Sequence, residues 1–418
     1  MSLGKTKAKR IMVDMIINLA GTGISLAILQ LVIYPIVAKA LGSEVYGQMQ
    51  SIISVLYLLS GTLGGALQTT RLVREYEYNE NRTVADFNLL SLGCIAATVV
   101  GIPVMMLLYA KGLSFIDIAL ITVIGIFNFT SNYYAVGFRL KIDYKAIFLS
   151  KIIGSLGYGI GYGIFCLTGK WQFVYIASFL LETLYYYLRT GLFREPCRKS
   201  PLFRKTTQTF ANLGIANLLS KTLTYFDKLL LYPLLGGTAV SIYVTANVFG
   251  KLILMTIEPI TNVVLSYLSK QKRVSKDIWK IAIVIGVAGC ALMYFVCLIV
   301  SGPVLNIFYP QWAEESLRLV PLTTLSLAIS AFVGIVYPFT LKTIDTSRQI
   351  ILNVIGIAVY IVSVMLLYRT TGVRGCCIAL IISYSVKLFF IFLFCVRKMK
   401  KEDKAEEREF SGEDEERI

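Results

Sequence analysis

The chain consists of repeated apolar runs, each about as long as a helix must be to cross a lipid bilayer. A bilayer core about 30 Å thick requires about 20 mostly apolar residues per helix. Reading the runs between charged residues and Gly or Pro breaks predicts twelve helices. They cover residues 11–38, 45–70, 88–110, 114–138, 146–168, 171–190, 211–235, 238–267, 278–301, 316–341, 349–369 and 373–396. The sequence therefore predicts an all-α, polytopic membrane protein with little room for a soluble domain.

The composition excludes several classes of soluble enzyme. Hydrophobic residues make up 56% of the 418 positions and charged residues 16%, where a soluble domain has about 25% charged residues. The chain has no histidine, which excludes a Ser-His-Asp triad, His-ligated zinc and a histidine proton relay. It has no GxxxxGK[ST] phosphate loop either, so we do not expect it to hydrolyse ATP. The eight cysteines have no CxxC spacing and are interpreted as packing residues.

The positive charges predict the orientation of the chain in the membrane. The net charge is +16, which in a soluble protein would suggest nucleic-acid binding. Here 29 Lys and Arg residues lie in the N-terminus, in every second loop and in the tail over 397–408, whereas the alternate loops hold six. Cytoplasmic loops of membrane proteins carry such an excess of Lys and Arg. The pattern predicts cytoplasmic N- and C-termini and no nucleic-acid partner.

The longest polar interruption, residues 191–210, divides the chain near its middle. We predict an N-terminal six-helix bundle over 1–190, a cytoplasmic linker over 191–210 and a second six-helix bundle over 211–397. A weak internal repeat supports two halves, since Tyr34-Pro35 and Tyr232-Pro233 lie 198 residues apart. Halves with an even number of helices are related by a pseudo-two-fold axis along the membrane normal. The charged tail, 398–418, is predicted to be disordered and cytoplasmic.

Charges inside apolar runs are the most informative candidates for function, because each is costly unless it is paired or faces an aqueous cavity. Lys221 and Lys228 are seven residues apart and share one face of the seventh helix. Lys251 and Glu258 share a face of the eighth in the same way. We hypothesise that Lys221, Lys228 and Lys251 are cavity cations that bind substrate. The competing interpretations are that Lys228 snorkels to the interface and that Lys251 and Glu258 form an ion pair to another helix.

Three intramembrane acids are candidates for ion or proton coupling: Asp227, Glu258 and Glu182. Asp227 directly precedes Lys228, so a local ion pair is the alternative for it. Glu182 and Lys387 lie in the middle of apolar runs, and the sequence assigns neither of them a partner. We expect no cofactor and no metal; coupling to H⁺ or Na⁺ is a hypothesis that rests on these acids.

Two short motifs carry a family resemblance. The stretch Leu41-Gly42-Ser43-Glu44-Val45-Tyr46-Gly47-Gln48, followed by a helix ending in Thr70-Arg71, is one. The other is Phe226-Asp227-Lys228-Leu229-Leu230-Leu231 before Leu235-Gly236. Together with the helix count, they resemble the polysaccharide transporter family, the Wzx-like flippases for O-antigen and capsule repeat units. That family belongs to the superfamily, called MOP, that also holds multidrug MATE exporters and the lipid II flippase.

The resemblance implies a multi-pass protein of the bacterial inner membrane that takes part in polysaccharide and lipopolysaccharide biosynthesis. It would move a polyprenyl-diphosphate-linked oligosaccharide from the cytoplasmic to the outer leaflet by alternating access, without being an enzyme. Its expected partners are membrane lipid, this lipid-linked substrate, a polysaccharide polymerase and a chain-length regulator. The charges agree with this function, because a diphosphate in a low-dielectric core needs cations.

Two other functions remain open from the sequence. An ion-coupled multidrug exporter of the MATE type would be expected to present acids and aromatic residues to its cavity, where this chain has lysines. A membrane O-antigen polymerase or glycosyltransferase would be expected to have a sizeable outer loop, whereas the longest outer loop here, residues 302–315, is short.

Overall fold

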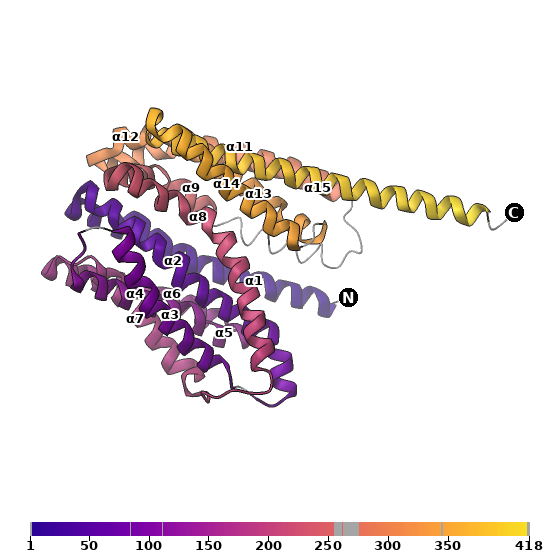
Figure 1. Ribbon diagram of the computed structural model, residues 1–418, viewed down its shortest axis with the longest axis horizontal. Coiled ribbons are helices and arrows are strands. Elements are labelled where there is room, and N and C mark those ends of the chain that lie inside the picture. Colours follow the sequence, from indigo (N-terminus) through magenta and orange to yellow (C-terminus); the bar gives the residue numbers. More distant parts are fainter. Residues whose placement is uncertain are drawn as a thin grey trace. The chain divides into compact units, whose positions relative to one another are not determined.

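The computed structural model describes residues 2–83, 85–110, 112–254, 261, 276–343 and 346–415. All of its regular elements are helices (Figure 1). The chain divides into two compact units. The first holds residues 1–244 with 308–311, and the second holds residues 245–307 with 312–418.

The first unit begins with two long helices that follow one another almost without interruption. Helix α1 (Ser2–Ile28) passes through a π-helical turn (Leu29–Ile33) into α2 (Tyr34–Glu80). Inside α2 the chain turns sharply at Gly42, where φ is 75° and ψ is 171°. A residue with a Cβ rarely adopts this conformation, so a glycine is needed here. The turn separates the first two predicted helices.

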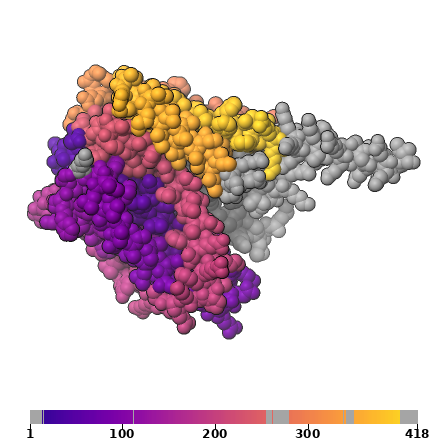
Figure 2. Space-filling view, in the orientation of Figure 1, coloured from indigo at the N-terminus to yellow at the C-terminus, as the bar shows by residue number. Residues whose placement is uncertain are grey.

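The remaining helices of the first unit match the third to seventh predicted segments. They are α3 (Phe87–Tyr109), α4 (Phe115–Tyr134), the short α5 (Val136–Leu140), α6 (Tyr144–Thr168), α7 (Gln172–Thr190) and α8 (Phe203–Ala246). Helix α8 turns at Gly236, where φ is 82° and ψ is 177°. Gly42 and Gly236 thus end the first and seventh predicted helices with almost the same backbone conformation. Figure 2 shows the first unit, indigo to magenta, as a closely packed body on the face in view.

Helices α6 and α7 pack closely because glycines line their interface. A Cβ at Gly157 would lie 2.5 Å from the Cα of Ser178, and one at Gly161 would overlap the Phe173 carbonyl oxygen. Small residues at such spacings let two helix backbones approach each other in a membrane. Gly157 and Gly161 are therefore packing residues.

Beyond α8 the described residues form six further helices, which belong to the second unit, and a short 3₁₀ turn. They are α9 (Val248–Leu254), α11 (Lys276–Phe308), the turn Pro310–Trp312, α12 (Ala313–Leu317), α13 (Val320–Thr343), α14 (Thr346–Thr371) and α15 (Val373–Glu415). A buried cluster including Trp279, Phe339, Leu352 and Ile391 joins α11, α13, α14 and α15.

The predicted fold class, all-α and polytopic, is confirmed. The described residues contain nine segments that are long and apolar enough to cross a membrane, and one of them, Ile16–Glu80, holds the first two predicted helices. Large apolar side chains are exposed on several helices, among them Leu108, Leu167 and Ile299, at 77%, 88% and 74%. Such exposure suits a surface that faces lipid. The eighth predicted helix passes through the end of α8 and α9 into residues outside the described ranges.

Two predicted boundaries differ from the observed helices. Helix α8 begins at Phe203, so the segment between helices is shorter than the predicted linker over 191–210. At the other end α15 continues to Glu415, where the sequence predicted disorder. The tail is rich in Glu and Lys, which have high helix propensity, and that propensity explains how the helix continues beyond the apolar run.

Candidate functional site

Lys221 and Lys228 lie on the side of α8 that meets α2. The ammonium nitrogen of Lys221 is 3.9 Å from the place that a Cβ on Gly65 would occupy. One turn further along α8, the rings of Tyr225 and Tyr57 have centroids 5.9 Å apart. Lys221 therefore lies against a neighbouring helix of the same unit, and the role of the two lysines as cavity cations stays a prediction.

Asp227 and Lys228 form a buried ion pair. Their exposed fractions are 6% and 5%, and the Lys228 ammonium nitrogen is 3.6 Å from Oδ1 of Asp227. Asp227 also accepts hydrogen bonds from the Tyr243 hydroxyl and the Lys228 backbone N–H, each at 2.7 Å. The interpretation of Asp227 as a local partner is confirmed, whereas Lys228 is buried and does not snorkel to the surface.

The backbone of α8 beside this pair is held by α2 and α3. The Ser51 hydroxyl donates to the Lys228 carbonyl at 3.5 Å. The Tyr109 hydroxyl lies 3.4 Å and 3.2 Å from the carbonyl oxygens of Lys228 and Leu229. A buried charge pair stabilises a protein only when its geometry is maintained, and these contacts hold the helix segment that carries it.

Glu182 has a partner that the sequence did not assign. Its carboxylate on α7 is 3.1 and 3.2 Å from the Lys151 ammonium on α6. The pair requires Gly154, because a Cβ there would overlap the Glu182 carboxylate. Glu182 is thus an ion-paired acid between tightly packed helices. The two residues are 31 positions apart, so only the packing of α6 against α7 reveals the pair.

The other candidate charges belong to the second unit or lie outside the described residues. Lys251 is half-buried on α9. Lys387 on α15 donates to the Asn353 side-chain oxygen on α14 at 2.7 Å, which gives this lone lysine a neutral partner. Glu258 lies outside the described residues.

A buried arginine missed by the sequence reasoning ties the linker to the first unit. Arg71, at the end of the resemblance motif on α2, makes two hydrogen bonds to the Glu195 carboxylate, at 2.5 and 2.7 Å. It also donates to the Tyr133 hydroxyl at 3.2 Å and lies over the Phe87 ring at 4.8 Å. Such two-point arginine–carboxylate pairing fixes geometry as well as charge. The only sequence signal for this contact was an arginine directly after an apolar run.

A second contact attaches the linker beside the first. Asp86 accepts hydrogen bonds from the Tyr78 hydroxyl at 2.6 Å and from the Ser200 backbone N–H at 2.6 Å. Burial and the hydrogen bond to Asp86 raise the pKa of Tyr78 to about 12. The segment between α7 and α8 is therefore held at both Glu195 and Ser200.

Near the start of α2, the turn at Gly42 lies against the turn at Gly236 in α8. Glu44 accepts hydrogen bonds from the backbone N–H groups of Gly237 and Thr238, at 2.8 and 2.9 Å. A Cβ on Gly47 would overlap the Gly237 carbonyl oxygen. The hydrogen bond from Gly237 lowers the pKa of the Glu44 carboxyl. Both resemblance motifs are thus packed against each other at this contact.

The described part of the chain contains no cluster of His, Cys, Asp or Glu that could hold a metal ion. The charged groups are arranged as ion pairs and as cations on α8, which can bind anions.

Several solved structures share the fold. Lipid II flippase MurJ in an inward closed conformation matches with a TM-score of 0.68 and 14% identity, over 93% of this chain and 87% of that one. An outward-facing multidrug resistance MATE family transporter of the MOP superfamily matches with a TM-score of 0.63 and 18% identity, over 94% and 96%. A MOP superfamily transporter from Pyrococcus furiosus, described as having a binding pocket of reversed polarity, matches with a TM-score of 0.57 and 15% identity, over 93% and 95%. At these identities the likeness shows the fold alone.

The fold and the apolar helices place the chain in the class of polytopic membrane proteins. Among curated proteins, no sequence matches it. A family described as polysaccharide biosynthesis protein matches residues 12–272. The chain belongs to this polysaccharide biosynthesis family, and the resemblance noted in its motifs is confirmed.

Proposed function

We propose that the protein is a flippase that moves a polyprenyl-diphosphate-linked oligosaccharide from the cytoplasmic to the outer leaflet of a bacterial inner membrane. The substrate class includes repeat units of O-antigen, capsule and exopolysaccharide. The family supports a role in polysaccharide biosynthesis. The fold is shared with a protein described as a lipid II flippase, so it is compatible with lipid-linked cargo.

The observation that carries this proposal is the face of α8 with Lys221 and Lys228. A diphosphate crossing the membrane must exchange its hydration for cations and hydrogen-bond donors, since unpaired charge in low dielectric is costly. Lys221 is half-buried on a membrane-spanning helix and lies beside a glycine. Lys228 is balanced by Asp227 at 3.6 Å, so an incoming anion would compete with that carboxylate. Within the membrane we propose Lys221 as the main contact of the diphosphate and Lys228 as a supporting contact. Lys251 is retained as a further candidate cation to test.

Transport of this kind requires alternating access and a driving force. We propose coupling to H⁺ or Na⁺ and retain Asp227, Glu182 and Glu258 as the acids to test. Asp227 is the first acid to test, because it forms an ion pair with Lys228, one of the lysines proposed to bind substrate. A polymerase and a chain-length regulator are the proposed protein partners.

The test is surface glycan display in a deletion strain carrying Lys221→Ala. We expect loss of most surface glycan and accumulation of lipid-linked repeat units on the inner leaflet, at normal protein level. Lys280→Ala is the matched control, because it removes an exposed lysine from α11. Unchanged glycan in the Lys221 variant would remove this lysine from the site.

The same strains separate the two alternative functions. A multidrug exporter would change drug susceptibility on deletion and leave surface glycan intact. A polymerase would leave single repeat units on the outer surface, whereas loss of a flippase keeps them inside.

A further inference from the structure

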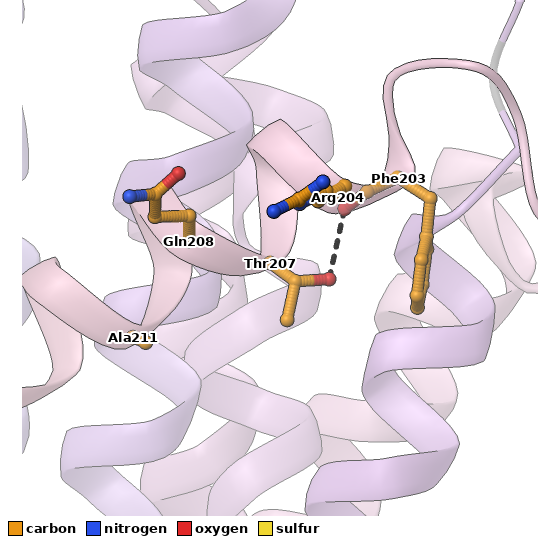
Figure 3. A pocket seen from close by; sticks show the side chains of 5 residues that line it. All are labelled: Phe203, Arg204, Thr207, Gln208 and Ala211. Atoms are coloured by element: carbon orange, nitrogen blue, oxygen red, sulfur yellow. Dashed lines mark hydrogen bonds between the residues drawn. The ribbon is translucent and has the colours of Figure 1, made fainter.

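A shallow pocket lies on the first turns of α8. None of the residues assigned to the proposed substrate site lines this pocket. Its walls come from one helix (Figure 3): Phe203, Arg204, Thr207, Gln208 and Ala211. It directly follows the linker, whose basic residues predict the cytoplasmic side of the membrane.

Arg204 and Gln208 supply the hydrogen-bond donors of this pocket. Arg204 is exposed, and within the described ranges no carboxylate lies at ion-pair distance from it. Its neighbour Lys205 differs, since its ammonium is 3.0 Å from the Glu77 carboxylate. The Thr207 hydroxyl donates to the Phe203 carbonyl at 2.9 Å, as the dashed line in Figure 3 shows. The guanidinium and the amide are therefore available to a ligand.

A second cation lies at the edge of the pocket. The Lys199 ammonium is 5.2 Å from the centroid of the Phe203 ring, within the range of a cation–π contact. An arginine fork with a lysine nearby is suited to phosphoryl oxygens, which the arginine binds at two points and the lysine as a point charge.

An exposed apolar row continues from the pocket along the same face of α8. Ile215 and Leu218 follow Ala211 at spacings of four and three residues, and their exposed fractions are 57% and 39%. Residues at these spacings lie above one another on a helix. From Arg204 to Leu218 the face is about 21 Å long at 1.5 Å per residue. A ligand with a phosphoryl head and a long hydrocarbon chain would use both parts, whereas free phosphate would use only the first.

We propose that this face of α8 is the entry site at which the prenyl diphosphate part of the substrate first binds. Arg204 and Gln208 hold the diphosphate, Lys199 adds charge at the rim, and the prenyl chain lies along Ala211, Ile215 and Leu218. The inference rests on the proposed function for the identity of its ligand. It adds a site separate from Lys221, Lys228 and Lys251.

The test measures binding of farnesyl diphosphate to the purified full chain in nanodiscs of uncharged lipid. Arg204→Ala should weaken binding about ten-fold, the loss expected from one hydrogen bond to a charged group. Lys205→Ala is the matched control, because it removes the same charge from the adjacent position of the same helix, and it should stay within two-fold of wild type. Equal losses in the two variants, or no loss in Arg204→Ala, would overturn the site.

Further binding measurements test which class of ligand the site binds. Inorganic diphosphate should bind at least ten-fold more weakly than farnesyl diphosphate, and Ile215→Asn should weaken only the prenylated probe. Equal binding of the two probes would overturn the role of the apolar row. Displacement of the probe by phosphatidylglycerol in the nanodisc at equal affinity would assign the pocket to bilayer phospholipid and overturn the entry site.

A failure of the proposed entry site and a failure of the proposed flippase function would give different experimental results. Binding is measured without translocation, so a negative result at Arg204 leaves the glycan phenotype of Lys221→Ala unaffected. A missing glycan phenotype likewise leaves the Arg204 binding data intact.

Discussion

The carboxylate of Glu44 accepts the backbone N–H of Gly237 at 2.8 Å, although 193 residues separate the two in sequence. The N–H belongs to the first turn of helix after the kink at Gly236. Such N–H groups have no partner within their own helix, and a negative charge is favourable there. The two motifs that carried the family resemblance therefore have a structural role, which is to join the turn of α2 to the turn of α8.

This contact should weaken in acid. The hydrogen bond from Gly237 lowers the pKa of Glu44 below its ordinary value of 4.5, so its stabilisation is fully present above that value. It is lost as the pH falls through the lowered pKa. Thermal unfolding in detergent, followed over a range of pH, measures this loss.

The matched variant for that measurement is Glu44→Gln. The side chain is exposed, so we expect this variant to lower the unfolding free energy by only about 0.5 kcal/mol at neutral pH. The difference from wild type should disappear in acid, where the wild-type carboxyl is protonated as well. A difference that persists in acid would assign the titration to another group.

A methyl group at Gly47 should separate the two turns. Its Cβ would overlap the Gly237 carbonyl oxygen. Neither the Cβ nor this backbone oxygen can rotate away from the other. We expect Gly47→Ala to cost about 1–3 kcal/mol, the usual range for overpacking, measured by thermal unfolding in detergent. Gly93→Ala is the control, because a Cβ there meets nothing within 4 Å. That substitution should be neutral or slightly stabilising, since Ala favours helix.

The Lys151–Glu182 pair should show strong coupling in a double-mutant cycle. Glu182→Gln leaves the Lys151 ammonium without its acid, and breaking a buried pair costs about 3–5 kcal/mol. Lys151→Met together with Glu182→Gln should recover most of the lost unfolding free energy. Glycan display then separates the two roles of Glu182, because a stable double variant that still exports glycan contradicts a function of this acid in ion coupling.

Lys387 and Asn353 should respond to substitution in opposite directions. Lys387→Met removes a half-buried charge whose observed partner is a neutral amide, so we expect equal or higher thermal stability. Asn353→Leu leaves the ammonium without its acceptor and should cost about 1–3 kcal/mol. Destabilisation by Lys387→Met would show that the lysine makes a favourable contribution that the single hydrogen bond does not explain.

The sequence predicted the helices well because a bilayer imposes a minimum length on each apolar run. Gly42 and Gly236 were visible as breaks between runs, and their positive φ angles show why these positions are glycine. Helix α8 begins before its predicted apolar run and α15 continues after its own. Local helix propensity can extend a helix beyond an apolar run, and the search for apolar runs does not detect it.

The sequence by itself determined which side chains carry charge inside apolar runs, since each charge stands out against its neighbours. Only the tertiary structure decided which of these charges are compensated. Lys151 meets Glu182 because glycines bring α6 and α7 close together, and Arg71 meets Glu195 because the linker folds back on α2 and α4. Partners of this kind are far apart along the chain, and electrostatic pairing depends on distance in space, which the order of residues does not contain.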